Sequence, residues 1–192
     1  IQRAAGIDPG ALGAAYVAST RPATADTPRF VDKLPHNFLY VGHIARALPN
    51  ARIILLRRNP MDTCLGNFRQ LFAQTSPYYD YSFDLLDTGR YWLMFDHLVR
   101  HWQAVLPGRL LEVRYEDLVD DQEGQTRRLL SHCDLPWDPA CLQFERNVAP
   151  VATASAVQVR EPLHRDALDR WRRYGPALDG LRTLLEAGGV EV

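Results

Sequence analysis

Ile53-Ile54-Leu55-Leu56-Arg57-Arg58-Asn59-Pro60-Met61-Asp62 is the stretch of sequence that decides the fold class. Its first four residues form a short, continuous apolar run, which is typical of a parallel strand that is buried on both faces. Asn59 is a good helix-capping residue, Pro60 suits the first helical position, and Asp62 occupies the capping-box position. The stretch therefore predicts a strand that leads directly into a helix ending near Ala73.

Further strands and helices alternate on both sides of this stretch. Strands are predicted at 29–33 and 110–115, and helices at 11–18, 38–48, 84–106, 121–132 and 177–187. The alternation implies an α/β fold, with a parallel sheet that is flanked by helices. In such a sheet, ligands bind at the carboxyl ends of the strands.

Length and charge narrow the classes of protein that need to be considered. The chain has 192 residues, 46% of them hydrophobic, which predicts one domain over residues 1–192. Its 22 basic residues are matched by 23 acidic ones, which argues against a nucleic-acid-binding groove. No apolar run is long enough for a membrane span. The first residue is Ile1 rather than methionine, so we expect a missing amino-terminal part.

Three cysteines, Cys64, Cys133 and Cys141, give no paired pattern of the kind that disulfide frameworks or zinc sites require. They are interpreted as thiols in a reducing compartment, so we expect a soluble, cytoplasmic protein. His97 and His101 have the spacing of metal ligands on a helix, but no third ligand accompanies them. The sequence therefore predicts no metal.

The start of the helix at Pro60 is a candidate anion site. Backbone N–H groups and the positive end of the helix dipole would face the ligand, and Arg58 could add two parallel hydrogen bonds to a phosphate. The alternative is that Arg58 pairs with a nearby carboxylate and that the motif is only a capped helix.

Lys33 is the only lysine among the 22 basic residues. It follows a predicted strand, at the edge of the sheet where side chains reach ligands. A compact ammonium on a flexible stem can follow charge that moves during a reaction better than a planar guanidinium can. A catalytic role for Lys33 is therefore one hypothesis, and an ordinary surface lysine is the other.

Four blocks of sequence follow one another along the chain, at residues 31–39, 49–65, 111–119 and 153–174. Their order makes the set more specific than any one block. Together they resemble the sulfotransferases that use 3′-phosphoadenosine 5′-phosphosulfate (PAPS). The resemblance is to the protein-tyrosine sulfotransferases and to bacterial sulfotransferases that often follow tetratricopeptide repeats. It spans about residues 29 to 175 and implies a P-loop-like fold, related to nucleotide kinases, with PAPS as co-substrate and no metal.

The resemblance also assigns roles to individual residues. Lys33 matches the lysine that stabilises the transition state, and Ser155 matches a second donor to the transferring group and the leaving phosphate. Arg58 and Arg170 match residues that bind the 3′-phosphate. Gly66 stands where the family has a serine that binds the same phosphate, and Arg69 lies one turn further along the helix.

The remaining implied contacts are to the nucleotide. Tyr115 matches a cofactor-contacting tyrosine, although a core tyrosine with a satisfied hydroxyl is an open alternative. The stretch 156–164, with Gln158, Val159 and Arg160, would wrap the adenine and the ribose phosphate. We expect an upstream repeat domain or a homodimer as partner.

In this family a loop cradles the 5′-phosphosulfate, and the general base usually follows that loop. No such loop is seen in the sequence before Lys33. We therefore expect both to lie outside this chain, which would be the carboxyl-terminal two-thirds of the domain. His36 is the only nearby residue with chemistry suitable for a base. The hydroxyl acceptor could be a protein tyrosine, a sugar or a small molecule.

Two other functions stay open. One is a non-catalytic relative that binds a nucleotide or a protein partner. Two observations favour it: no 5′-phosphosulfate loop is seen before Lys33, and Gly66 stands in place of the family serine. A nucleotide or sugar kinase would need a Gly-Lys-Ser/Thr loop and a magnesium-binding acid, and neither is visible in the sequence.

Overall fold

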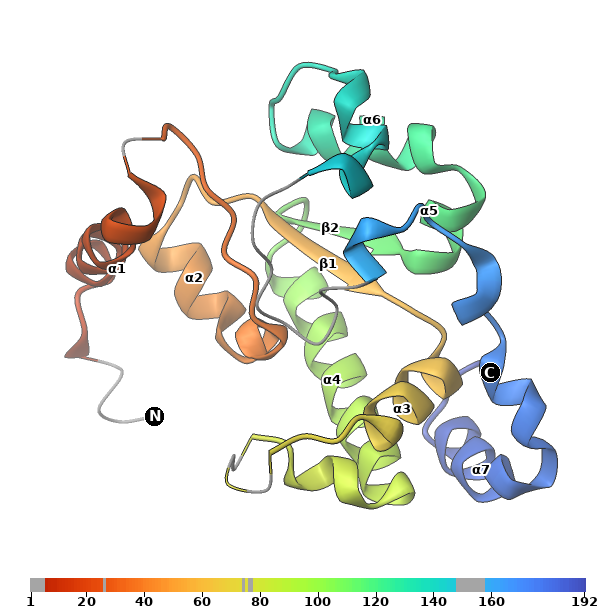
Figure 1. The fold of residues 1–192 in the computed structure, drawn as a ribbon. Helices are drawn as coiled ribbons and strands as arrows, with labels where there is room; N and C mark the ends of the chain where they lie inside the picture. The colour runs from red at the N-terminus through yellow and green to blue at the C-terminus, as the bar shows by residue number, and fades with distance from the viewer. Residues whose placement is uncertain (1–5, 26, 74, 76–77, 148–157) are drawn as a thin grey trace. The chain divides into compact units, whose positions relative to one another are not determined.

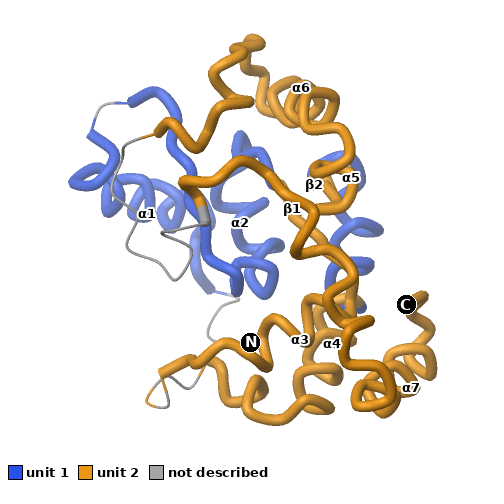
Figure 2. Tube along the Cα trace, turned by 45° about the vertical axis from the view of Figure 1, so that its right-hand side comes forward, with its two compact units in different colours: residues 1–53, 97–109 blue, residues 54–96, 110–192 orange. Residues whose placement is uncertain are grey.

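The computed structural model describes residues 6–25, 27–73, 75, 78–147 and 158–192. The chain divides into two compact units (Figure 2). Unit 1 consists of residues 1–53 and 97–109, and unit 2 of residues 54–96 and 110–192. The single domain over residues 1–192 stays a prediction.

The sheet pairs strand β1 (Ile53–Arg57) with strand β2 (Leu110–Arg114), as Figure 1 shows. The two strands are parallel, which requires a long crossover connection between them. Helices α3 (Pro60–Arg69) and α4 (Leu85–Val105) supply that connection. The predicted α/β class and the two predicted strands at 53 and 110 are confirmed.

Two expectations about strands are wrong. The apolar run of β1 is not buried on both faces, because Ile54 is 44% and Leu56 59% exposed while the alternate residues are half-buried. Residues 29–33 do not form a strand. They have no regular secondary structure, because a strand needs a hydrogen-bonded neighbour, and within the described ranges the sheet has only β1 and β2.

The core of unit 2 forms where α3 and α4 meet the 3₁₀ helix η8 (Arg170–Leu178) and helix α7 (Asp179–Ala187). Its buried members are Met61, Cys64, Leu65, Trp92, Trp171, Leu178, Leu181, Leu185 and Val190. Gly89 lets α4 approach α7 closely, since a Cβ there would lie 2.7 Å from a methyl group of Leu181. This packing fixes α3 beside η8, which sets the geometry of the candidate site.

Unit 1 is built on helix α1 (Pro9–Thr24), the 3₁₀ helix η2 (Pro35–Tyr40) and helix α2 (Val41–Ala47). Asp8 caps α1, and the helix runs further than the predicted end at residue 18. Helix α1 packs against α2 at Gly13, where a Cβ would overlap the Ala47 carbonyl. The Trp102 Nε1–H donates to the Phe38 carbonyl at 2.8 Å.

The remaining elements are short, apart from the predicted helix at 121–132. They are η3 (Asp80–Phe83), α5 (Tyr115–Asp120), α6 (Gln122–His132), η4 (Pro139–Leu142), η5 (Phe144–Arg146), η6 (Gln158–Arg160) and η7 (Arg165–Ala167). In the part of the chain that the structure describes, no helix is both long and apolar enough to cross a membrane. Burial raises the pKa of the Cys64 thiol to about 12.

Candidate functional site

The turn between β1 and α3 is capped more completely than the sequence predicts. The Asn59 side chain accepts hydrogen bonds from the Met61 and Asp62 N–H groups at 2.9 and 3.2 Å. The next N–H, that of Thr63, donates to the Asn59 carbonyl at 2.9 Å. Pro60 has no N–H. The expectation that free N–H groups at this helix end face an anion is therefore wrong, because the cap already uses them.

The two arginines at the end of β1 have different surroundings. Arg57 forms ion pairs with Asp96 and Glu112, and its guanidinium carbon lies 5.5 Å from the centre of the Trp92 ring. Asp96 is 2% exposed. These contacts assign Arg57 to the protein interior and leave Arg58 as the arginine that can face a ligand.

Arg58 is held by several groups of unit 2. It donates to the Ala167 carbonyl, and its guanidinium carbon lies 5.5 Å from the centre of the Tyr115 ring. Its Nη2 atom lies 3.6 Å from an oxygen of Asp62. The open alternative of a carboxylate partner is thus observed. The side chain remains 29% exposed, so it can still reach a ligand from solvent.

Asp62 joins the start of α3 to the start of η8. Its side chain is 1% exposed, and one carboxylate oxygen accepts a hydrogen bond from the Trp171 N–H at 3.0 Å. The other oxygen is buried and accepts no hydrogen bond from the described residues. Since Trp171 follows Arg170, this carboxylate fixes the backbone next to the second arginine of the predicted site.

A small, open pocket lies at this junction. Its lining residues are Arg58, Asp62, Leu65, Gly66, Arg69 and Arg170. Four of these come from α3, where their spacing puts them on one face of the helix. The pocket thus combines three cations with one buried carboxylate, an arrangement suited to a group with more than one negative charge, such as a phosphate.

The structure therefore brings together three of the residues predicted from the sequence, Arg58, Gly66 and Arg170, around one pocket. Tyr115 is close to Arg58, although it starts α5 rather than ending a strand as expected. Val159 is half-buried and Arg160 exposed, both in η6, which begins at Gln158. Ser155 lies outside the described residues.

Lys33 belongs to unit 1 and is exposed in a segment without regular secondary structure. The neighbouring Asp32 anchors this segment, because its carboxylate accepts hydrogen bonds from the Tyr16 hydroxyl at 2.7 Å and from Asn37 at 3.4 Å. Burial and the bond to Asp32 raise the pKa of Tyr16 to about 12. His36 is 8% exposed, which does not favour the role of a solvent-accessible base.

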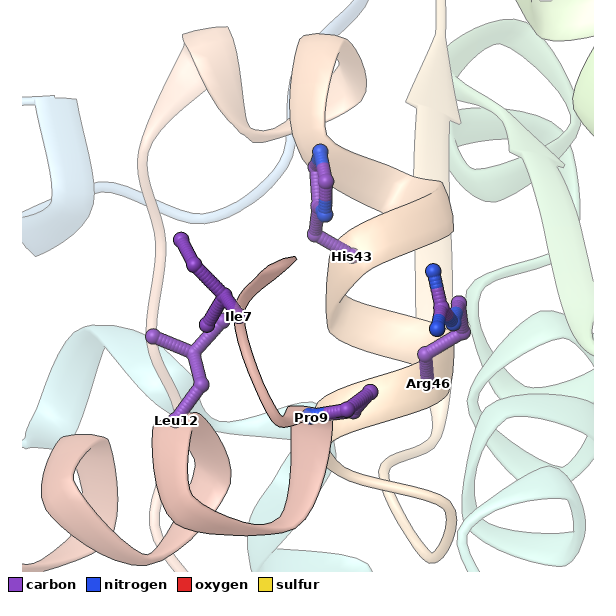
Figure 3. Close-up of a pocket in the computed structure, with 5 residues that line it drawn as sticks. All are labelled: Ile7, Pro9, Leu12, His43 and Arg46. Atoms are coloured by element: carbon purple, nitrogen blue, oxygen red, sulfur yellow. The ribbon is translucent and has the colours of Figure 1, made fainter. Parts of the chain in front are cut away.

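Unit 1 also contains a shallow pocket at the start of α1 (Figure 3). Ile7, Pro9 and Leu12 line one side, and His43 and Arg46 of α2 line the other. These residues combine an apolar surface with one imidazole and one guanidinium. They provide no carboxylate.

Reasoning from the sequence missed two features of the site. The contact between Asp62 and the Trp171 N–H joins residues 109 positions apart, which no local pattern indicates. Glu116 accepts from the Asn59 N–H at 2.7 Å and so braces the capped turn. In the sequence, only the position of Glu116 in the block at 111–119 could have indicated that its carboxylate supports the turn after β1.

Comparisons with known proteins identify the family. Residues 2–139 match the family model described as "Sulfotransferase family". An uncharacterized protein of Aquifex aeolicus is 37% identical over 175 residues, which cover 90% of this chain and 23% of that protein. Protein-tyrosine sulfotransferase A of Caenorhabditis elegans is 28% identical over 153 residues, 75% of this chain and 39% of the enzyme. The chain thus spans less than half of either relative.

The fold gives the same result. The sulfotransferase domain from the curacin biosynthetic pathway superposes with a TM-score of 0.64, at 17% sequence identity. The match covers 93% of this chain and 68% of that domain. Because the family model matches most of the chain and the fold agrees, this chain belongs to the sulfotransferase family.

Proposed function

We propose that the protein transfers a sulfuryl group from PAPS to a hydroxyl acceptor, and that this chain holds the 3′-phosphate of the donor. The observation that carries the proposal is the pocket lined by Arg58, Gly66 and Arg170, which come from two distant parts of the sequence. All three stand at positions that the family resemblance connects with that phosphate, although Gly66 lacks the hydroxyl of the family serine. The exposed guanidinium surface in the pocket fits a phosphate dianion.

The proposed reaction breaks one bond and forms one bond. The acceptor oxygen attacks sulfur, the bond from sulfur to the oxygen of the 5′-phosphate breaks, and adenosine 3′,5′-bisphosphate leaves with the electron pair. The acceptor proton passes to a base. Catalysis would rest on orientation and on the stabilisation of charge that develops on the bridging oxygen, as in phosphoryl transfer.

Lys33 and Ser155 are the groups proposed to donate to the sulfuryl group and to the bridging oxygen. The exposure of Lys33 and the anchoring of Asp32 by Tyr16 support a lysine that is free to reach solvent from a fixed backbone. The ammonium would match the developing charge without a proton transfer of its own. Gln158, Val159 and Arg160 are proposed to contact the nucleotide.

A tyrosine hydroxyl in a protein is the proposed acceptor. The similarity to protein-tyrosine sulfotransferase A of C. elegans over 75% of this chain supports this choice over a sugar or a small molecule. We also propose that the protein works in the cytoplasm. No disulfide joins any two of its cysteines, as is usual in a reducing compartment.

Calorimetric titration with adenosine 3′,5′-bisphosphate and with 5′-AMP tests the proposed donor site. The bisphosphate should bind more tightly, and Arg58→Ala should weaken the bisphosphate about 10- to 100-fold, the effect of losing hydrogen bonds to a charged group. Affinity for 5′-AMP should change little. Arg182→Ala is the matched control, because it removes a guanidinium paired with Asp179 on the surface of α7. Equal affinities for the two nucleotides would contradict the assignment.

A further inference from the structure

Gly66 and Arg69 lie one turn apart on the pocket-lining face of α3. Apart from the two neighbouring residues and the backbone of α3 itself, no atom of the described residues lies within 4 Å of the place that a Cβ of residue 66 would occupy. The surface of the helix at Gly66 is therefore open. A longer side chain from the next turn can cross it without a clash.

The geometry of an α-helix directs Arg69 towards that opening. Side chains lean towards the amino terminus of their helix, so each covers the surface over the preceding turn. The three residues from Gly66 to Arg69 rise only about 4.5 Å, which the length of an arginine side chain spans. The guanidinium of Arg69 also lies 5.9 Å from the centre of the Tyr174 ring, on the same 3₁₀ helix as Arg170.

The pocket needs donors that the helix end does not supply. The Asn59 cap uses the N–H groups of Met61 and Asp62, and Arg58 already donates to the Ala167 carbonyl. Within the described ranges, Arg69 makes no hydrogen bond or ion pair. Its donors are thus available to a ligand.

We propose that Arg69 is a phosphate-binding residue of this pocket and that it replaces the hydroxyl missing at Gly66. The inference rests on the proposed function and deepens it, because it names a further binding residue for the same phosphate. The family resemblance connects a serine at position 66 with this phosphate. When the phosphate binds, the guanidinium of Arg69 reaches from its position beside Tyr174 across the open surface at Gly66 and supplies the donors from one turn away. Tyr174 steadies the guanidinium by a cation–π contact.

A double-mutant cycle at positions 66 and 69 tests this substitution, with calorimetric binding of adenosine 3′,5′-bisphosphate and 5′-AMP to the protein as the measurement. Arg69→Ala should weaken the bisphosphate by about tenfold, the lower end for hydrogen bonds to a charged group, and leave 5′-AMP unchanged. Gly66→Ser alone should change the affinity less than threefold, because Arg69 already fills the place. In the Arg69→Ala background, Gly66→Ser should recover most of the lost affinity.

Arg173→Ala is the matched control. Arg173 is an exposed arginine of η8 and is not among the residues that line the pocket, so its loss removes the same charge from outside the pocket. A weakening equal to that of Arg69→Ala would show that general electrostatics, rather than direct binding, is responsible, and would overturn the inference. Additive effects of Gly66→Ser and Arg69→Ala would also overturn it.

The binding data distinguish a failure of the proposed role of Arg69 from a failure of the proposed 3′-phosphate site. If the unmodified protein prefers the bisphosphate and Arg58→Ala removes that preference, but Arg69→Ala has no effect, then the 3′-phosphate site stands and Arg69 has no part in it. If the unmodified protein does not distinguish the bisphosphate from 5′-AMP, the donor site itself is wrong, and the role of Arg69 fails with it.

Discussion

Replacing Asp62 by alanine should lower the free energy of unfolding by about 3 kcal/mol, because it removes a buried hydrogen bond to a charged group. The carboxylate is 1% exposed and accepts the Trp171 N–H at 3.0 Å. Losing a hydrogen bond to a charged group costs about 1.5–3 kcal/mol, and an orphaned buried N–H adds to that. The ion pair with Arg58 adds less, because that guanidinium is 29% exposed and keeps its bond to the Ala167 carbonyl.

Asp62→Asn separates the two contacts of the carboxylate. The amide keeps an oxygen for the Trp171 N–H but turns an N–H₂ group towards Arg58, so the cost should fall to about 1 kcal/mol. Equilibrium unfolding in urea, followed by tryptophan fluorescence, compares both variants with the unmodified protein at a common m-value. Equal losses for the alanine and asparagine variants would refute the reasoning, because the bond to Trp171 would then contribute nothing. A loss below about 0.5 kcal/mol for alanine would refute it as well.

Two further predictions concern catalysis and packing. Lys33→Ala should lower kcat at least about 10²-fold, the scale for removing one preorganised donor, with little change in bisphosphate affinity, and Lys33→Arg should restore only part of the rate. A folded Lys33→Ala variant, checked by circular dichroism, with near-normal kcat would leave Lys33 as a surface residue. Gly89→Ala should destabilise the protein by about 1–3 kcal/mol in thermal or urea unfolding, because the new methyl group would lie 2.7 Å from Leu181. Gly180→Ala on α7, with its nearest contact at 3.8 Å, should be neutral or stabilising, and a similar loss there would argue against the packing explanation.

The sequence predicted those parts of the fold that depend on neighbouring residues. The apolar run of β1 and the cap at Asn59 were both recognisable, and both are observed at Ile53–Arg57 and at the start of α3. The long helix α4 was also predicted within one residue at each end, because its apolar residues recur with helical spacing over 21 residues. Local chemistry was sufficient in each of these cases.

Features that depend on distant partners could not be predicted in the same way. Residues 29–33 have a strand-like composition, but a strand exists only where a neighbour completes its hydrogen bonds. The anion site was inferred from the helix start and Arg58. Arg58 lines the pocket, but the Asn59 side chain takes the N–H groups that the inference also required. The pocket instead lies along the side of α3, where η8 contributes Arg170.

Sulfuryl transfer itself tests the central claim most directly. The intact protein, including the segment expected to precede this chain, is incubated with PAPS labelled at sulfur and with three acceptors, a tyrosine-containing peptide, a simple phenol and a sugar alcohol. The label on each acceptor is measured together with the bisphosphate released. The proposed function predicts label on the tyrosine oxygen, one equivalent of adenosine 3′,5′-bisphosphate for each label transferred, and loss of both with Lys33→Ala. Tight binding of the bisphosphate without label on any of the three acceptors would contradict the claim and favour a protein that binds the nucleotide without catalysing transfer.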